Sequence, residues 1–241
     1  MTVLPGDPTD PFPTTVSAGV TLVAIFGACL IGSTGAIRIA PLLMETAGLT
    51  LYAVGMWFRR RGHRLAGRSA TAVGLLIAGG GLLGAVVLAP PLPTLLPLLA
   101  CGLGALSVTL GVFPVSVRVA RPLSTVGIAL VFVGVTATTV VGTPSLWRST
   151  VAVTLVFLSW DASERAIALG NRVGDTAETV AVELTGLAAS VVVAAVAIAL
   201  TLAAARVPIT GPSIIGLAFL LVSSVFCLLA LTHVPQSVDA D

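Results

Sequence analysis

Charged and aromatic side chains are scarce in this sequence, and lysine is absent, so that all 12 basic residues are arginine. Of the 241 residues, 9% are charged, 5% are aromatic and 56% are hydrophobic. Soluble domains carry about a quarter charged residues, so the composition excludes a conventional water-soluble enzyme. It also excludes a disordered chain, which needs low hydrophobicity, and a net charge of +2 is too small to indicate nucleic-acid binding. We therefore expect an integral membrane protein built of α-helices.

Catalytic and metal-binding patterns are also lacking. Cys29, Cys101 and Cys227 each stand alone in an apolar run, so we expect small buried hydrophobes rather than zinc ligands or disulfides. The only two histidines, His63 and His233, do not form the HExxH spacing of a metalloprotease. We therefore expect no enzymatic activity, no cofactor and no metal site.

Eight apolar runs are each long enough to cross a bilayer core of ~30 Å, which takes about 20 residues. Prolines and glycines separate most of them, because proline lacks a backbone donor and ends helices. The predicted helices are 15–36, 39–58, 69–89, 92–113, 123–142, 146–168, 182–205 and 212–233. The break between the first two is short, so seven helices with an irregular first pair is the alternative.

A single transmembrane helical domain is therefore expected over residues 15–233, flanked by two tails. Residues 1–14 are rich in proline and contain no basic residue, whereas a secretory signal begins with positive charge. We expect a retained Pro-rich tail here and an acidic tail over residues 234–241.

Arginines predict the orientation of the bundle. One connection carries five of them within ten residues: Arg59, Arg60, Arg61, Arg64 and Arg68. Short cytoplasmic connections are enriched in basic residues, so we expect this loop and both termini in the cytoplasm. Alternating from this loop puts nine of the 12 arginines inside and three outside. The loop is a topology determinant or, alternatively, binds anionic lipid head groups.

Small residues at four-residue spacing predict where helices approach closely, because lipid provides no hydrophobic force between them. Gly80 and Gly84 form a GxxxG pair in the third predicted helix. Gly186 and Ser190 have the same spacing in the seventh. We expect both pairs to lie at helix–helix contacts.

Residues 157–187 are the most informative stretch. They contain half of the ten acidic residues: Asp161, Glu164, Asp175, Glu178 and Glu183. Gly170-Asn171 predicts a helix end, and Gly174-Asp175 predicts the start of the next helix. The resulting helical hairpin would turn near Arg172.

Within this hairpin, Asp161 and Glu183 each lie eleven residues from Arg172, so we expect them at similar height, ~16 Å from the turn. Glu164 shares a helix face with Asp161, and Arg165 has the i+4 spacing for an ion pair with it. These four residues are a candidate polar network, either a proton or ion relay or a set of salt bridges that fixes the hairpin.

The sixth helix bears on this choice. Its uncharged part ends at Trp160 and spans only ~22 Å, less than the membrane core. Either this helix is short, or the adjacent charged groups enter the inner leaflet and face the bundle interior. Trp160 would be a packing residue or an interfacial anchor. Glu45 is a further intramembrane acid, nearer the outer face, with Arg38 as its candidate partner.

The pattern Trp160-Asp161-x-x-Glu164-x-Ala166-x-x-Leu169-Gly170 resembles a family of uncharacterised haloarchaeal multi-pass membrane proteins. Members of that family are often encoded beside a MoxR-type ATPase, a von-Willebrand-like domain protein and a transglutaminase-like protein. Many read Leu-Gly-Glu-Gln-Leu-Gly where this chain has Leu169–Gly174, so the chain lacks a carboxylate at the turn. The resemblance implies a source and a genetic neighbourhood, and it implies no reaction.

Two functions remain open from the sequence. A non-enzymatic scaffold or accessory subunit of a membrane complex is favoured, since the basic 59–68 loop and the acidic hairpin have opposite charge and suit docking on each other or on a partner, including an ATPase-linked assembly. The alternative is a small transporter or channel in the cell membrane, with the hairpin acids as its relay.

Overall fold

The computed structural model consists of helices and their short connections in the residues that it describes, which are 13–33, 36–88, 92–114, 117–142, 144–173 and 180–206. The helices are α1 (Thr15–Gly32), α2 (Ala36–Arg60), α3 (Arg64–Leu88), α4 (Leu92–Val112), α5 (Ala120–Gly142), α6 (Leu146–Val173) and α7 (Val180–Ala204), with a short 3₁₀ helix, η1 (Val117–Val119), before α5. The predicted all-α fold is confirmed. The eighth predicted helix, 212–233, lies outside the described residues.

Six of the described helices are long and apolar enough to cross a membrane: α1, α2, α3, α4, α5 and α7. The first predicted pair is resolved into two separate helices, α1 and α2, each of which meets this criterion. The helix missing from the set is α6, whose C-terminal half carries Asp161, Glu164 and Arg165. The composition and these six helices together identify a membrane protein.

The end of α6 differs from the prediction. The helix continues through Gly170 and Asn171 to Val173, so the helix end predicted at these two residues is wrong. A glycine inside a helix costs only about 1 kcal/mol relative to alanine. The helix therefore continues through Gly170, which is buried, despite this cost. The segment predicted to start the next helix, Gly174-Asp175, lies outside the described residues.

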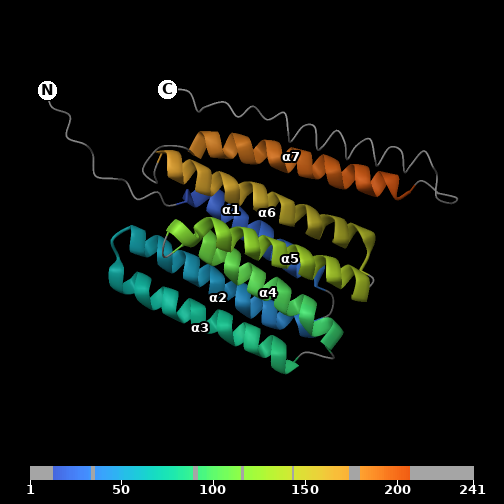
Figure 1. Ribbon diagram of the computed structural model, residues 1–241, viewed down its shortest axis with the longest axis horizontal. Helices are drawn as coiled ribbons and strands as arrows, with labels where there is room; N and C mark the ends of the chain where they lie inside the picture. Colours follow the sequence, from blue (N-terminus) through green and yellow to red (C-terminus); the bar gives the residue numbers. More distant parts are fainter. Residues whose placement is uncertain are drawn as a thin grey trace. The chain divides into compact units, whose positions relative to one another are not determined.

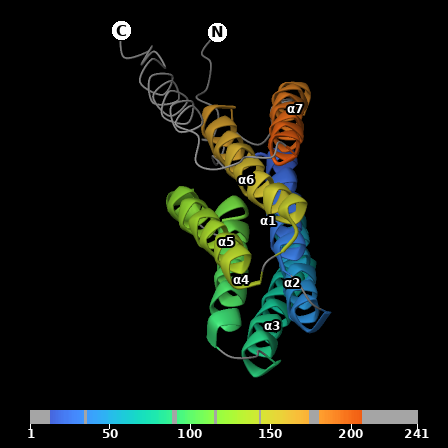
Figure 2. The same ribbon diagram turned by 90° about the vertical axis from the view of Figure 1, so that its right-hand side faces the viewer.

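The helices of the compact unit Met1–Leu202 pack mainly as pairs. The closest pairs are α2 with α3, α4 with α5, and α1 with α6, and α1 also contacts α2, α4 and α5. Figures 1 and 2 show these helices running lengthwise beside one another. The core is therefore centred on α1, where Ile25, Ala28 and Cys29 are fully buried. The second unit, Ala203–Asp241, is described only as far as Arg206.

Glycines spaced by seven residues bring the paired helices close. A Cβ atom on Gly74 of α3 would lie 2.6 Å from the backbone nitrogen of Tyr52 and 2.7 Å from the carbonyl oxygen of Gly48. On α5, a Cβ on Gly127 would lie 2.6 Å from the backbone nitrogen of Val108. Both pairs use the same device, in which the glycines of one helix lie against the backbone of its partner. They are Gly48 and Gly55 of α2, Gly67, Gly74 and Gly81 of α3, Gly104 and Gly111 of α4, and Gly127 and Gly134 of α5.

The contact predicted at Gly80 and Gly84 is therefore corrected. A Cβ on Gly80 would approach only the terminal methyl of Met44, at 3.0 Å, and a Cβ on Gly84 would have nothing within 4 Å. Gly81 makes the close approach to α2 instead, since a Cβ there would lie 2.8 Å from the backbone nitrogen of Glu45. At 3.6 residues per turn, Gly80 points about 100° away from Gly81, so a shift of one residue moves the contact to another face.

Candidate functional site

Glu183, at the start of α7, caps the N-terminus of α1. Its Oε2 atom accepts three hydrogen bonds, from Thr14 Oγ1 at 3.0 Å, from the Ser17 backbone nitrogen at 3.0 Å and from Ser17 Oγ at 2.7 Å. A helix N-terminus has unpaired N–H groups and a partial positive charge, which favour a carboxylate. Thr14 occupies the N-cap position but makes no side-chain capping bond, so the cap comes from the distant residue Glu183, which is only 3% exposed.

Two further helices join the same place. The backbone nitrogen of Thr14 donates to the carbonyl oxygen of Ala166 on α6, at 3.1 Å. Arg60, the last residue of α2, donates from Nη1 to the carbonyl oxygen of Pro13, at 3.2 Å. The start of α1 is thus hydrogen-bonded to α2, α6 and α7, and we call Pro13–Ser17 the α1 hub.

A second polar junction joins α6 to α7. Arg165 Nε lies 2.9 Å from Asp161 Oδ2, which confirms the predicted i,i+4 pair. Ser190 of α7 completes it, since its hydroxyl donates to Asp161 Oδ2 at 2.6 Å and lies 3.1 Å from Arg165 Nη2. Gly186 leaves room for the guanidinium of Arg165, which a Cβ atom there would overlap. Gly186 and Ser190 therefore do face a neighbouring helix.

Glu164 has a different partner. Its Oε2 atom pairs with Arg121 Nη2 of α5 at 2.8 Å, on the surface, where the Arg121 side chain is 71% exposed. The four residues of the predicted network thus belong to three groups, at the α1 hub, at the α6–α7 junction and at the α5–α6 surface.

The predicted register of the hairpin is also corrected. Ser190, and not Glu183, lies level with Asp161, and seven helical residues correspond to ~10 Å. The pair Asp161–Ser190 is centred between residues 175 and 176 rather than on Arg172. The reason is that α6 continues to Val173, so the turn comes later than the glycine pattern suggests.

The arginines of residues 59–68 lie mainly on the surface. Arg59, Arg61, Arg64 and Arg68 are exposed, whereas Arg60 is partly buried at the α1 hub. The guanidinium of Arg61 stacks 3.9 Å above the ring of Trp57, a favourable cation–π contact. Arg118 and Arg121 are exposed on η1 and at the start of α5. In Figure 1 the start of α5 and the turn between α2 and α3 lie at the same end of the bundle, on the left. We call these exposed arginines the basic end.

Trp160 is 50% exposed. It lines a groove between α5 and α6 together with Ile128, Phe132 and Phe157. The rings of Phe132 and Phe157 meet edge to face there, with centroids 6.0 Å apart. The indole is thus packed on one side and open on the other, a position that suits an interfacial anchor.

Glu45 of α2 is 2% exposed, deep between α3 and α4. Its Oε1 atom is buried without a hydrogen-bond partner. Gly102 of α4 leaves the space that its carboxyl group occupies, because a Cβ there would lie 2.6 Å from Oε2. The side chain of Arg38, its predicted partner, lies outside the described residues.

Two cysteines meet beside this carboxyl group. The thiol of Cys29 on α1 donates to the carbonyl oxygen of Cys101 on α4, at 3.7 Å. Both are free and buried, as small hydrophobes are. From the sequence we expect isolated cysteines, because no sequence pattern shows that α1 and α4 are neighbours. Among the described residues, no three His, Cys, Asp or Glu side chains are grouped to hold a metal ion.

Comparison with known proteins assigns no activity. The model of a family of unknown function, DUF7519, matches residues 80–228, more than half of the chain and including the stretch around Trp160–Gly170. No curated protein and no solved structure matches. An uncharacterised family agrees with the resemblance seen in the sequence, whereas the haloarchaeal source and the gene neighbourhood stay predictions.

Proposed function

This chain belongs to the family of unknown function DUF7519, and we propose that it is a non-enzymatic scaffold or accessory subunit of a complex in the cell membrane. One observation carries the proposal. Asp161, Glu164 and Glu183 each bind side chains or backbone of another helix. They join α5, α6, α7 and α1, which is the work of structural links.

A proton or ion relay makes a different demand on these acids. Its carboxylates need to exchange a proton or an ion with one another or with water. Here Glu183 Oε2 accepts three bonds at the α1 hub, and Asp161 Oδ2 accepts from both Arg165 and Ser190. Hydrogen bonds to a charged group contribute about 1.5–3 kcal/mol each. Moving either carboxylate would break two or three of these hydrogen bonds and would therefore cost several kcal/mol.

The basic end is the surface that we assign to a partner. Excess arginine marks cytoplasmic connections, so this end would face the cytoplasm, with both chain termini on the same side. Its exposed guanidinium groups suit an acidic protein surface, since arginine pairs with carboxylates in a bidentate geometry. An ATPase-linked assembly is the partner that the gene neighbourhood of the resembling family suggests.

Neutralising part of the basic end tests this assignment. We would replace Arg61, Arg64 and Arg68 by glutamine together and leave Arg60 intact, because Arg60 holds the α1 hub. Cross-linking in intact cells, followed by purification in mild detergent, should recover several-fold less partner with this variant than with the wild type. Arg148→Gln is the matched control, because Arg148 lies at the start of α6, outside the basic end, with its guanidinium over the ring of Trp147. Purification of this variant should recover the wild-type amount of partner. An unchanged partner set in a triple variant that melts like the wild type would contradict the proposal.

A small transporter is the second candidate, and one observation favours it. Asp161 and Arg165 line an open groove between α6 and α7 whose remaining lining is mainly apolar, from Phe157 to Ala197. Proton flux through purified protein in liposomes distinguishes the two functions. Flux that disappears in the combined variant Asp161→Asn, Glu164→Gln and Glu183→Gln would favour transport, and wild-type protein without flux would favour the scaffold.

A further inference from the structure

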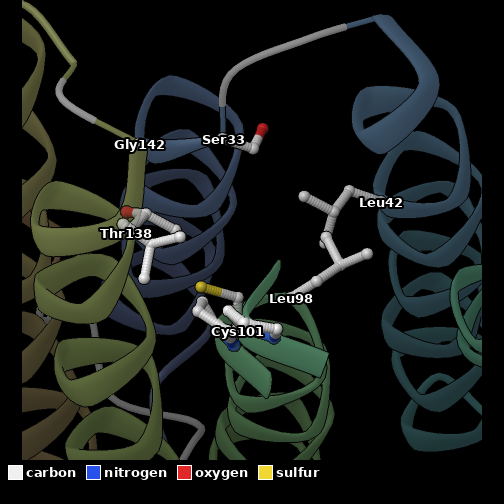
Figure 3. Close-up of a pocket in the computed structure, with 9 residues that line it drawn as sticks. Ser33, Leu42, Leu98, Cys101, Thr138 and Gly142 are labelled. Atoms are coloured by element: carbon white, nitrogen blue, oxygen red, sulfur yellow. The ribbon is translucent and has the colours of Figure 1, made fainter. Parts of the chain in front are cut away.

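A small pocket opens at the end of the bundle away from the basic end. Ser33, Thr138 and Gly142 lie around it, Cys101 lies deeper, and Leu42 and Leu98 face each other across one side (Figure 3). The space open to the centre of a water molecule is about 20 Å³. A cavity of this size holds one or two waters. The hydroxyl groups of Ser33 and Thr138 donate to backbone carbonyl oxygens of their own chain segments, so each offers such a water an acceptor.

Glu45 lies about one helical turn deeper than this pocket. On α2 it follows Leu42 by three residues, and on α4 its contact Gly102 follows Leu98 by four. Leu42 and Leu98 are 3% and 7% exposed and belong to one apolar cluster. Both leucines line the pocket and stand one helical turn before Glu45 and Gly102 in their helices, so we assign to them the wall between the pocket and the carboxyl group.

The surroundings of Glu45 favour a neutral carboxyl group. α3 contributes Gly81 and Leu82, which carry no charge. Among the described residues of the other packed helices, the titratable groups beside it are the thiols of Cys29 and Cys101. A carboxylate buried without a partner costs several kcal/mol, and the acid with its proton avoids that cost.

On its other side, Glu45 is sealed. The next residues of α2 toward the basic end that face inward are Leu49 and Tyr52, which are 0% and 2% exposed. Beside them, Gly48 and Gly74 hold the backbones of α2 and α3 in contact. The path for water from the pocket to Glu45 is therefore short. On the side of Glu45 that faces the basic end, the closely packed core blocks water.

We propose that Glu45 is a proton-binding site that exchanges its proton through this pocket and on this side only. When Leu42 and Leu98 separate, water in the pocket relays a proton from the bulk solvent to the carboxylate and is itself left neutral, and the proton returns by the same route. Nothing else is transferred, so the site stores a proton without conducting it across the bundle. This inference does not depend on the scaffold function, since it rests on a separate group of residues.

Infrared spectroscopy of the full chain in liposomes tests the proposal. A protonated carboxyl group has its own carbonyl stretch, which shifts when the proton exchanges for deuterium. We expect one such band at neutral pH in the wild type, its loss in Glu45→Gln, and its retention in Glu183→Gln as the matched acid. No difference between the wild type and Glu45→Gln from neutral to acidic pH would overturn the proton site.

The access route has a readout of its own. Leu98→Ala thins the wall and should speed the deuterium shift of the Glu45 band several-fold, whereas Thr138→Leu fills the pocket and should slow it several-fold. The melting temperature of each variant in detergent shows that the bundle is intact. Equal exchange rates in the wild type and both variants would overturn access through the pocket.

Discussion

Glu183 contributes a carboxylate to Thr14, which is 169 residues away in the sequence. The α1 hub therefore depends on a contact that no local pattern indicates. By contrast, the pair of Asp161 with Arg165 follows from their spacing on one helix, because side chains four residues apart are neighbours. At the residue scale, the sequence predicts ion pairs within a helix and leaves those between helices undetermined.

Removing the cap should lower stability. Glu183→Ala takes away the acceptor of three hydrogen bonds at the start of α1, so we expect a loss of several kcal/mol and a lower melting temperature in detergent. Thr185→Ala is the matched control, since Thr185 is exposed and bonds only to the carbonyl oxygen of Ala181 in its own helix. If Glu183→Ala and Thr185→Ala had the same melting temperature, Glu183 would not be a structural link.

Arg60 and Arg61 are neighbours with different roles. Arg60 donates to the carbonyl oxygen of Pro13 and lies 5.7 Å from the centre of the Phe113 ring, whereas exposed Arg61 stacks on Trp57. We therefore expect Arg60→Gln to lower the melting temperature by more than Arg61→Gln does. Melting curves of the two purified variants check this, and the reverse order would refute the α1 hub as described.

At the scale of elements, the two closest helix pairs share one design. Glycines seven residues apart lie on one face of a helix after two turns, and they recur in α2 with α3 and in α4 with α5. The apolar runs predict the helices well, and all seven described ones lie within a few residues of expectation. The four-residue GxxxG spacing predicts the wrong packed face of α3, because the contact with α2 is made by the seven-residue series Gly67, Gly74 and Gly81.

Alanine substitutions at Gly74 and Gly84 of α3 test which face of this helix packs against α2. Gly74→Ala places a methyl group against the backbone of Tyr52 and Gly48, so we expect a loss of about 1–3 kcal/mol from overpacking. Gly84→Ala meets nothing within 4 Å and should gain up to about 1 kcal/mol of helix propensity. The two melting temperatures should thus shift in opposite directions. A lower melting temperature for Gly84→Ala than for Gly74→Ala would instead support the predicted contact at Gly80 and Gly84.

At the scale of the whole molecule, most of the charged residues that the structure describes gather at one end, with Glu45 and Arg148 among the exceptions. The loop 59–68, the segment 118–121 and the acids of α6 and α7 all lie where α2 and α6 finish and α3, α5 and α7 begin. The composition predicts a membrane protein, and arginine counting predicts which ends belong together. The partner contacts of Glu164 and Glu183 required the structure, because they depend on which helices are neighbours in three dimensions.

The scaffold proposal requires that the basic end face the cytoplasm, and cysteine labelling in intact cells measures this directly. The parent carries Cys227→Ser and keeps Cys29 and Cys101, which are buried. A membrane-impermeant maleimide should leave His63→Cys unlabelled until the cells are permeabilised, and should label Ser145→Cys, in the exposed connection between α5 and α6, without permeabilisation. Labelling of His63→Cys from outside intact cells would place the basic end away from a cytoplasmic partner and contradict the account.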